Sequence, residues 1–278
     1  SFDDNFLEKP SSSDVTIDSI FSRRLYAESH LWKAYYSLVP RGFPYSTGNP
    51  TPPPEDEFSR SILASISDEG DNIRGATCGK YINPVGLWPV VTQKNQEDYF
   101  PYHFKGIREA YIFIENIDRV KDIPQEEKDQ MKAEAKVLIA LRYQEMLKRY
   151  GAVPVVRHSF TTDDNLKISR ATFQETVDFI IEMCDEAVPY LPVIQPEQWR
   201  GRVTKGVAFA LKSRVLLYAA SPLYNTGSTI LSYSNPEFVS YGNYDIERWK
   251  LAVDAAVEAL DWAADPAAQC YQIGRAHV

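Results

Sequence analysis

Residues Pro124–Gly151, PQEEKDQMKAEAKVLIALRYQEMLKRYG, predict the longest helix of the chain, around which the other helices are expected to pack. Acidic side chains lie in its first turn and basic side chains in its last turn, which complements the helix dipole. A glycine follows the final residue, as is common where helices end. Apolar and small side chains cover most of its circumference, so only a stripe through Arg142, Glu145 and Arg149 is expected to stay polar. A helix that is apolar over most of its girth packs on several sides, which predicts a central helix.

The composition indicates a globular chain with a substantial core. Its 278 residues suffice for one large domain or two small ones, and 44% of them are hydrophobic. The net charge of -8 excludes a basic nucleic-acid surface. No apolar run reaches the roughly 20 residues of a membrane span. The cysteines Cys78, Cys184 and Cys270 are odd in number and widely spaced, which favours neither a metal cluster nor a complete set of disulfides.

Further helices are predicted on both sides of the central one, from apolar residues at helical spacing and from capping residues. Thr172 and Glu175 form a capping box at the start of one of them. A two-residue break separates the helix at 102–121 from the central helix, so the two should form an antiparallel hairpin. The predicted helices span residues 16–39, 57–66, 102–121, 172–191, 204–221 and 245–264. This pattern predicts an all-α fold of stacked helical hairpins of the tetratricopeptide kind.

Nothing in the sequence selects an active site. The nucleophile motif G-x-S-x-G, the zinc motif H-E-x-x-H and a phosphate-binding glycine loop are all lacking. The acidic residues Asp68, Glu69 and Asp71 do not have the spacing of a calcium loop, and a solvated turn is the plainer interpretation. We therefore expect no enzyme activity, no catalytic residue, no metal site and no cofactor.

Five segments, in the same order along the chain, resemble the SusD/RagB family of nutrient-binding outer-membrane lipoproteins. The most specific is EAKVLIALRYQEMLKRYGAVPVV, residues 134–156, which is similar to the signature helix of that family. The others are DNFLEKP (4–10), YHFKGIREAYIFIENID (102–118), RATFQETVDFIIEMCDEAVPYLP (170–192) and GRVTKGVAFALKSRVLLYAASPLYN (201–225). Two features depart from the pattern: Ile139 replaces an expected arginine, and Ser1, Phe2 and Asp3 do not supply the lipid-bearing cysteine.

The resemblance implies a function and a location. Members capture oligosaccharides or other nutrients at the cell surface and pass them to a TonB-dependent, SusC-like outer-membrane transporter during polysaccharide utilisation. Their tetratricopeptide-like hairpins face the transporter, and long irregular loops on the opposite side bind ligand. The implied location is the outer membrane, with contact to the membrane only through a lipid anchor that this sequence lacks. A helical-repeat scaffold that binds a protein segment is the alternative.

The loop at 67–98 is the predicted ligand site. It is longer than the roughly 12–15 residues usual for connections without function, and the resemblance places part of the glycan site there. Sugars need flat apolar surfaces and planar polar groups. Trp88 could instead anchor the loop on the helices, and the residues alone favour that interpretation; Trp199, in a shorter loop, is expected to be structural. The predicted glycan contacts are Asn72, Arg74, Tyr81, Asn83 and Trp88.

The end of the sequence carries two further expectations. Residues 273–278, IGRAHV, resemble a translated sequencing adapter and are taken as a non-native tail. Residues 1–272 are expected to form a single domain that is incomplete at its C-terminus, since members of the family are much longer. The helix at 245–264 should then expose apolar side chains, because its partner would be missing.

Overall fold

The computed structural model describes residues 16–36, 100–161, 164, 167–230 and 232–268. Within them the chain forms seven α-helices joined by turns and 3₁₀ segments, and these residues contain no strand. The chain divides into two compact units, one of residues 1–35 with 106–278 and one of residues 36–105. The helices belong to the first unit, except for the last residue of α2 and the start of α5. The prediction of an all-α fold is confirmed.

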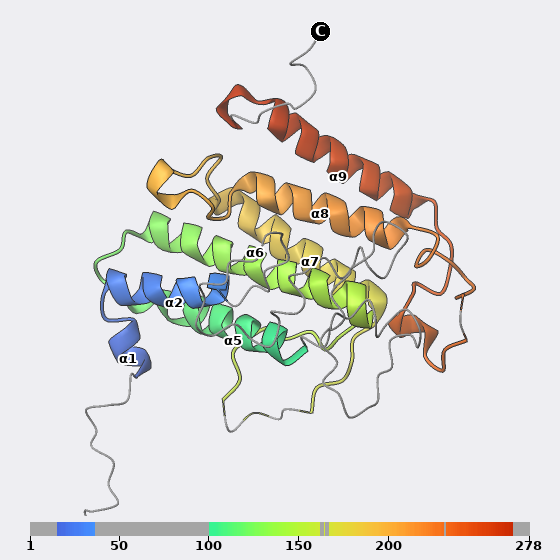
Figure 1. Cartoon of the computed structure of the whole chain (residues 1–278), viewed down its shortest axis with the longest axis horizontal. Helices are drawn as coiled ribbons and strands as arrows, with labels where there is room; N and C mark the ends of the chain where they lie inside the picture. Colours follow the sequence, from blue (N-terminus) through green and yellow to red (C-terminus); the bar gives the residue numbers. More distant parts are fainter. Residues whose placement is uncertain (1–15, 37–99, 162–163, 165–166, 231, 269–278) are drawn as a thin grey trace, which may run out of the picture. The chain divides into compact units, whose positions relative to one another are not determined.

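Helix α6, Gln125–Tyr150, is the predicted central helix, and it begins and ends where the sequence indicated. Figure 1 shows it with α2 and α5 on one side and α7 and α8 on the other. Gly151 follows its last residue with a φ of 70°, and a side chain there would strike the backbone carbonyl of Phe238. Only glycine meets both requirements at low cost, so the residue after α6 is fixed by its own backbone conformation and by the contact with Phe238.

The polar stripe predicted for α6 is wrong at Arg142. This side chain is 1% exposed, because Gly106 of α5 leaves the space that the guanidinium fills. Its Nη2 donates to the backbone carbonyl of Ala34 at 2.8 Å, near the end of α2. Burial lowers the pKa of Arg142 to about 10. Glu145 and Arg149 stay partly exposed and form an ion pair at 2.9 Å.

The single helix predicted at 16–39 is two helices, α1 (Ile17–Ile20) and α2 (Arg24–Tyr36). The turn between them buries Phe21, whose ring contacts His30 with a centroid separation of 5.5 Å. The backbone N–H of Arg24 donates to Asp122 Oδ1 at 2.8 Å, so a carboxylate far along the chain caps the start of α2. The break therefore depends on a contact that local periodicity does not show.

The first predicted hairpin pairs α5 (Phe100–Asn116), which ends in a 3₁₀ turn at Ile117–Arg119, with α6. The two helices run in opposite directions in Figure 1. Lys128 and Lys132 of α6 reach back to Asp118, to its backbone carbonyl at 3.2 Å and its carboxylate at 2.7 Å.

The second predicted hairpin is also present, formed by α7 (Phe173–Ala187) and α8 (Lys205–Ala220). The capping box is confirmed: the Glu175 N–H donates to the Thr172 hydroxyl at 3.1 Å, and the Thr172 N–H donates to the Glu175 carboxylate at 2.7 Å. The 3₁₀ segments Val188–Tyr190 and Glu197–Trp199 lie in the connection between the two helices.

The last described helix, α9 (Glu247–Ala264), lies beyond α8 (Figure 1) and is followed by a 3₁₀ turn at Pro266–Ala268. Its N-cap is Ile246, and the carboxylate of the preceding Asp245 accepts from the N–H of Glu247 at 3.0 Å. Only Ala252 and Ala255 are buried, in a cluster with Leu216 and Ala220 of α8. The expected exposure of apolar side chains on this helix is confirmed at Leu251, Val253, Val257 and Leu260.

The two longest described connections, 151–172 and 221–246, meet at one end of the first unit. The N–H of Ala152 donates to the carbonyl of Phe238, in the 3₁₀ segment Pro236–Phe238, at 2.8 Å. The Arg170 guanidinium lies over the Phe238 ring, with Cζ 4.8 Å from the centroid. These contacts tie the connection after α6 to the connection after α8.

Candidate functional site

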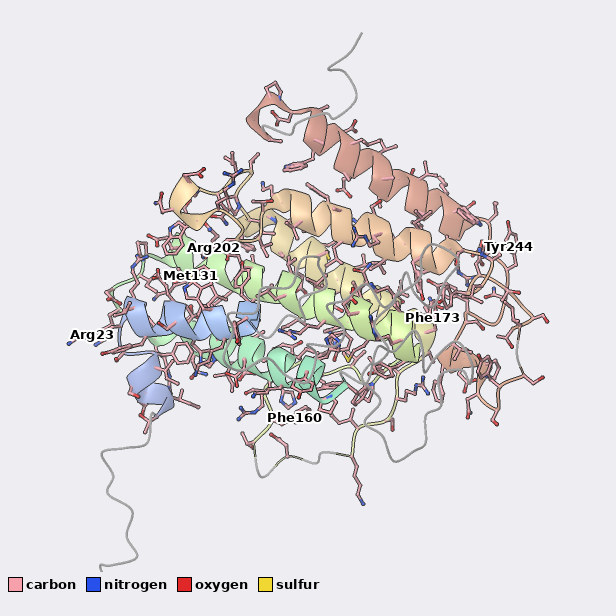
Figure 2. The ribbon with its side chains drawn as sticks, viewed as in Figure 1. Arg23, Met131, Phe160, Phe173, Arg202 and Tyr244 are labelled. Atoms are coloured by element: carbon pink, nitrogen blue, oxygen red, sulfur yellow. The ribbon has the colours of Figure 1, made fainter. Side chains whose placement is uncertain are left out.

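The loop predicted as the glycan site lies outside the described residues. This applies to the short helix predicted at 57–66, to the acidic residues at 68–71 and to the five predicted contacts Asn72, Arg74, Tyr81, Asn83 and Trp88. Their assignment stays a prediction. Among the aromatic contacts of the described part, two clusters join a helix to a connecting segment, and they lie toward opposite ends of α6. Figure 2 marks one end by Arg202 and the other by Phe173.

The first cluster joins a tryptophan of α2 to a tryptophan of the connection before α8. The indole rings of Trp32 and Trp199 stack with a centroid separation of 5.8 Å and an interplanar angle of 28°. The guanidinium carbon of Arg202 lies 5.0 Å from the Trp199 ring centroid and 5.8 Å from that of Trp32. Cation–π attraction at such distances stabilises both the charge and the position of the rings. We call Trp32, Trp199 and Arg202 the tryptophan cluster.

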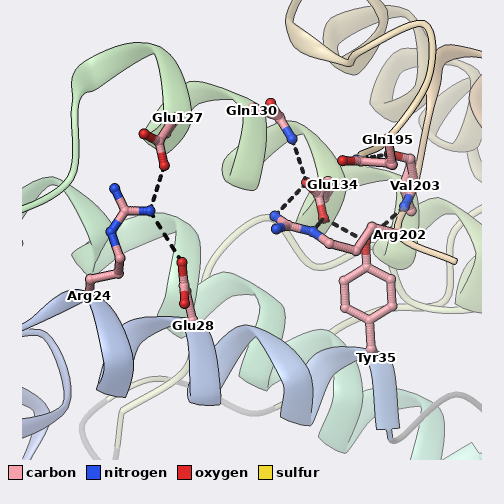
Figure 3. Close-up of polar contacts among 9 residues, drawn as sticks. All are labelled: Arg24, Glu28, Tyr35, Glu127, Gln130, Glu134, Gln195, Arg202 and Val203. Atoms are coloured by element: carbon pink, nitrogen blue, oxygen red, sulfur yellow. Dashed lines mark hydrogen bonds and ion pairs between the residues drawn. The ribbon is translucent and has the colours of Figure 1, made fainter. Parts of the chain in front are cut away.

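A buried ion pair fixes the base of the tryptophan cluster (Figure 3). Arg202 donates from Nε and Nη2 to the two carboxylate oxygens of Glu134, at 2.9 and 2.7 Å, and both side chains are almost fully buried. The Tyr35 hydroxyl donates to Glu134 at 2.6 Å and accepts from the N–H of Val203 at 3.0 Å. Gln130 adds a further hydrogen bond to Glu134 at 3.2 Å. The network therefore connects α2, α6 and the connection before α8.

The electrostatics of this network favour the charged form of Arg202. Burial opposes the charge on Arg202, but the hydrogen bonds and charge of Glu134 outweigh it and raise the pKa of Arg202. Burial, together with the adjacent Glu134 carboxylate, raises the pKa of Tyr35, so its hydroxyl keeps its proton. A bidentate Arg–carboxylate pair with further hydrogen bonds has a defined geometry. The rings above it are consequently held on a rigid support.

Helical periodicity and local motifs do not reveal this cluster. Trp32 was one apolar residue of a predicted helix, and Trp199 was expected to be structural. The structure does pack Trp199 against Trp32 and Arg202, as a structural residue would. The one local signal is Glu134, a carboxylate between Ala133 and Ala135 and outside the predicted polar stripe, on a helix predicted to pack on several sides. Its partner Arg202 lies 68 positions later, beyond the reach of periodicity.

The second cluster lies where the connection after α8 covers the start of α7. Phe173 stacks on Tyr224 with a centroid separation of 4.9 Å and meets the edge of Tyr241 at 5.1 Å. Arg248 lies over Tyr241, 3.7 Å from the ring centroid, and burial raises the pKa of Tyr241 to about 12. Phe173 is fully buried, so this cluster fastens a connection to the helices.

Among the described residues no group suggests catalysis or metal binding. No set of three His, Cys, Asp or Glu side chains there is placed to hold a metal ion. His30 is buried against Phe21, and burial lowers its pKa although Glu109 opposes the shift. The thiol of Cys184 is buried, which raises its pKa to about 12 and makes it a poor nucleophile. The helices of the described part also include none that is long and apolar enough to span a membrane.

Comparison with known proteins defines the class. A SusD-like family model, described as starch-binding and associating with the outer membrane, matches residues 80–217. This range contains Tyr81, Asn83 and Trp88 of the predicted site, whereas Asn72 and Arg74 precede it. No curated protein matches the chain.

Solved structures agree with the family match. A SusD-like protein from Bacteroides fragilis is 23% identical, with a TM-score of 0.60 over 90% of this chain and 41% of its own. A SusD-like carbohydrate-binding protein from the same species is 18% identical, with a TM-score of 0.61 over 87% of this chain and 41% of its own. A laminarin-binding SusD-like protein is 20% identical, with a TM-score of 0.56 over 72% of this chain and 41% of its own.

The helical fold is that of SusD-like solved structures, and residues 80–217 match the model of the SusD-like family. This is a carbohydrate-binding family associated with the outer membrane. The chain spans about two fifths of the length of the solved structures that it matches.

Proposed function

We propose that this protein captures an oligosaccharide at the cell surface and passes it to a TonB-dependent, SusC-like outer-membrane transporter, without catalysing a reaction. The observation that carries the proposal is the match of residues 80–217 to a family described as starch-binding and associated with the outer membrane. A fold relative that binds laminarin supports a glycan as ligand. A lipid anchor would hold the protein at the outer membrane.

The proposed ligand contacts are the five loop residues Asn72, Arg74, Tyr81, Asn83 and Trp88. Indole and phenol rings offer flat surfaces to the C–H faces of a sugar ring, while amides and the guanidinium bond the hydroxyls in more than one direction. Contacts of this kind give moderate affinity, which suits a protein that must release its ligand to a transporter.

The test is a panel of polysaccharides, including starch and laminarin, screened on native affinity gels with protein expressed from the complete gene. We expect retarded migration in at least one gel, and about tenfold weaker binding by Trp88→Ala, since an aromatic contact contributes roughly 1.4 kcal/mol. Tyr244→Ala, which removes an exposed aromatic ring next to α9, is the matched control and should bind as the wild type does.

Two outcomes would contradict parts of the proposal. Wild-type binding that Trp88→Ala leaves unchanged would remove Trp88 from the site. A protein that binds no glycan but binds a peptide would replace the proposal by the helical-repeat scaffold. Co-purification with a large outer-membrane transporter tests the proposed partner separately.

A further inference from the structure

The tryptophan cluster has a feature that its structural role does not require. Trp32 is 38% exposed although it stacks on Trp199 and lies near Arg202, and Trp199 is itself partly exposed. If the two rings only shielded the Glu134–Arg202 ion pair, burying them fully would stabilise the fold more. Each square ångström of apolar surface removed from water contributes about 25 cal/mol to the free energy of folding. The rings instead keep apolar surface at the boundary with water.

The exposed rings are also unusually well fixed. Trp32 comes from α2 and Trp199 from the 3₁₀ segment before α8, two segments that are far apart in sequence. Both are positioned by Arg202, which Glu134 holds with two hydrogen bonds. The rings therefore lose their conformational entropy when the protein folds. A ligand that stacks on them does not have to order them, which favours binding.

The residues next to Trp199 in the sequence carry planar polar groups: a carboxylate, an amide and a guanidinium. Its sequence neighbours Glu197, Gln198 and Arg200 are all exposed, and Arg200 and Glu197 form a surface ion pair at 3.2 Å. A carboxylate, an amide and a guanidinium next to a partly exposed indole can each bond two hydroxyls of one ring. This combination of a flat apolar face and planar polar groups matches a pyranose ring better than an extended protein helix, which would need a continuous apolar groove.

We propose that Trp32 and Trp199 form a second glycan contact, on which a sugar ring stacks at the surface above the Glu134–Arg202 pair. The inference rests on the proposed function, since it assumes a glycan ligand, but it assigns residues outside the loop at 67–98. Glu197, Gln198 and Arg200 bond hydroxyls at the edge of the stacked ring. Arg202 and Glu134 are positioning residues that do not touch the sugar.

The first test compares oligosaccharide affinities by titration calorimetry, with a saccharide that the wild type binds. We expect Trp32→Ala and Trp199→Ala each to weaken binding about tenfold, as for a lost aromatic stacking contact. Tyr26→Ala, which removes an exposed ring from another face of α2, is the control and should leave the affinity unchanged. Thermal unfolding of each variant shows whether the fold is retained.

A second measurement observes ligand binding to the wild-type protein directly. Fluorine NMR of wild-type protein labelled with 5-fluorotryptophan gives one signal per tryptophan, assigned by single Trp→Phe changes. Saturation with the saccharide should shift the signals of Trp32 and Trp199 and leave that of Trp262, whose indole nitrogen is buried, in place.

The outcomes separate the two proposals. Wild-type binding with unchanged affinities for Trp32→Ala and Trp199→Ala, and with unshifted signals for both residues, would overturn the second contact and leave the proposed function standing. A wild type that binds no glycan would overturn the proposed function and the second contact together. Shifts caused by a peptide and by no saccharide would assign the surface to a protein partner instead.

Discussion

Helix α6 buries charged and polar side chains, whereas helix α9 leaves apolar side chains exposed. Helix α6 is rich in charged residues, yet Lys128, Glu134, Arg142 and Gln144 are buried along it together with its apolar side chains. Helix α9 carries Leu251, Val253, Val257 and Leu260 at the surface and buries only two alanines. Burial in this fold is thus set by the place of a helix in the stack more than by its own hydrophobicity.

The difference also separates two kinds of polar interaction. The Glu134–Arg202 pair of α6 is almost fully buried and bidentate, whereas Glu258 of α9 meets Lys212 at 3.3 Å with its side chain about half exposed. Desolvation makes the first pair costly to break on one side only, while solvent screening leaves the second nearly neutral. The comparison can therefore be tested by substitutions matched between the two helices.

The largest effect is expected for Glu134→Ala. It would leave the Arg202 guanidinium buried without its carboxylate, at a cost of about 3–5 kcal/mol in the free energy of unfolding. The matched Glu258→Ala should change that free energy by less than about 1 kcal/mol. Urea denaturation measures both, and similar values for the two variants would contradict the difference between the helices.

A comparable contrast is expected between two leucines. Leu138 of α6 is 1% exposed, so Leu138→Ala should destabilise the protein by about 2–5 kcal/mol through lost burial and a cavity. Leu260 of α9 is 68% exposed, and Leu260→Ala should stay within about 0.5 kcal/mol of the wild type. A large loss for Leu260→Ala in thermal or urea unfolding would mean that another surface covers α9 in solution.

The smallest contrast is expected between two glycines. A methyl group at Gly106 would overlap the guanidinium of Arg142, and one at Gly206 would overlap the ring of Trp262 on α9. Arg142 is buried and bonded to Ala34, so Gly106→Ala should cost about 1–3 kcal/mol. Trp262 is partly exposed and can move outward, so Gly206→Ala should cost less. Equal unfolding free energies would show that Arg142 also relaxes easily.

The sequence predicted the elements whose determinants are local. The capping box at Thr172 and the positive φ of the glycine after α6 act within a few residues, and the helix boundaries that depend on them were predicted closely. The break between α1 and α2 was missed because its cap, Asp122, lies 98 positions from Arg24.

Side-chain environments were harder to predict than helices. Arg142 looked like a surface residue, since nothing in its own helix reveals that Gly106 opens a space for it. The pairing of Trp32 with Trp199 and of Glu134 with Arg202 likewise depends on how distant segments pack. The loop residues proposed as glycan contacts were chosen by chemistry and resemblance, and they stay a prediction.

The most direct test of the central claim is glycan binding by the wild-type protein itself. Titration calorimetry against the polysaccharide that retards it on affinity gels should give saturable binding, with a heat signal that disappears when the protein is unfolded. We expect saturable binding by the folded protein only. The absence of binding across starch, laminarin and the rest of the panel would contradict the proposed glycan capture.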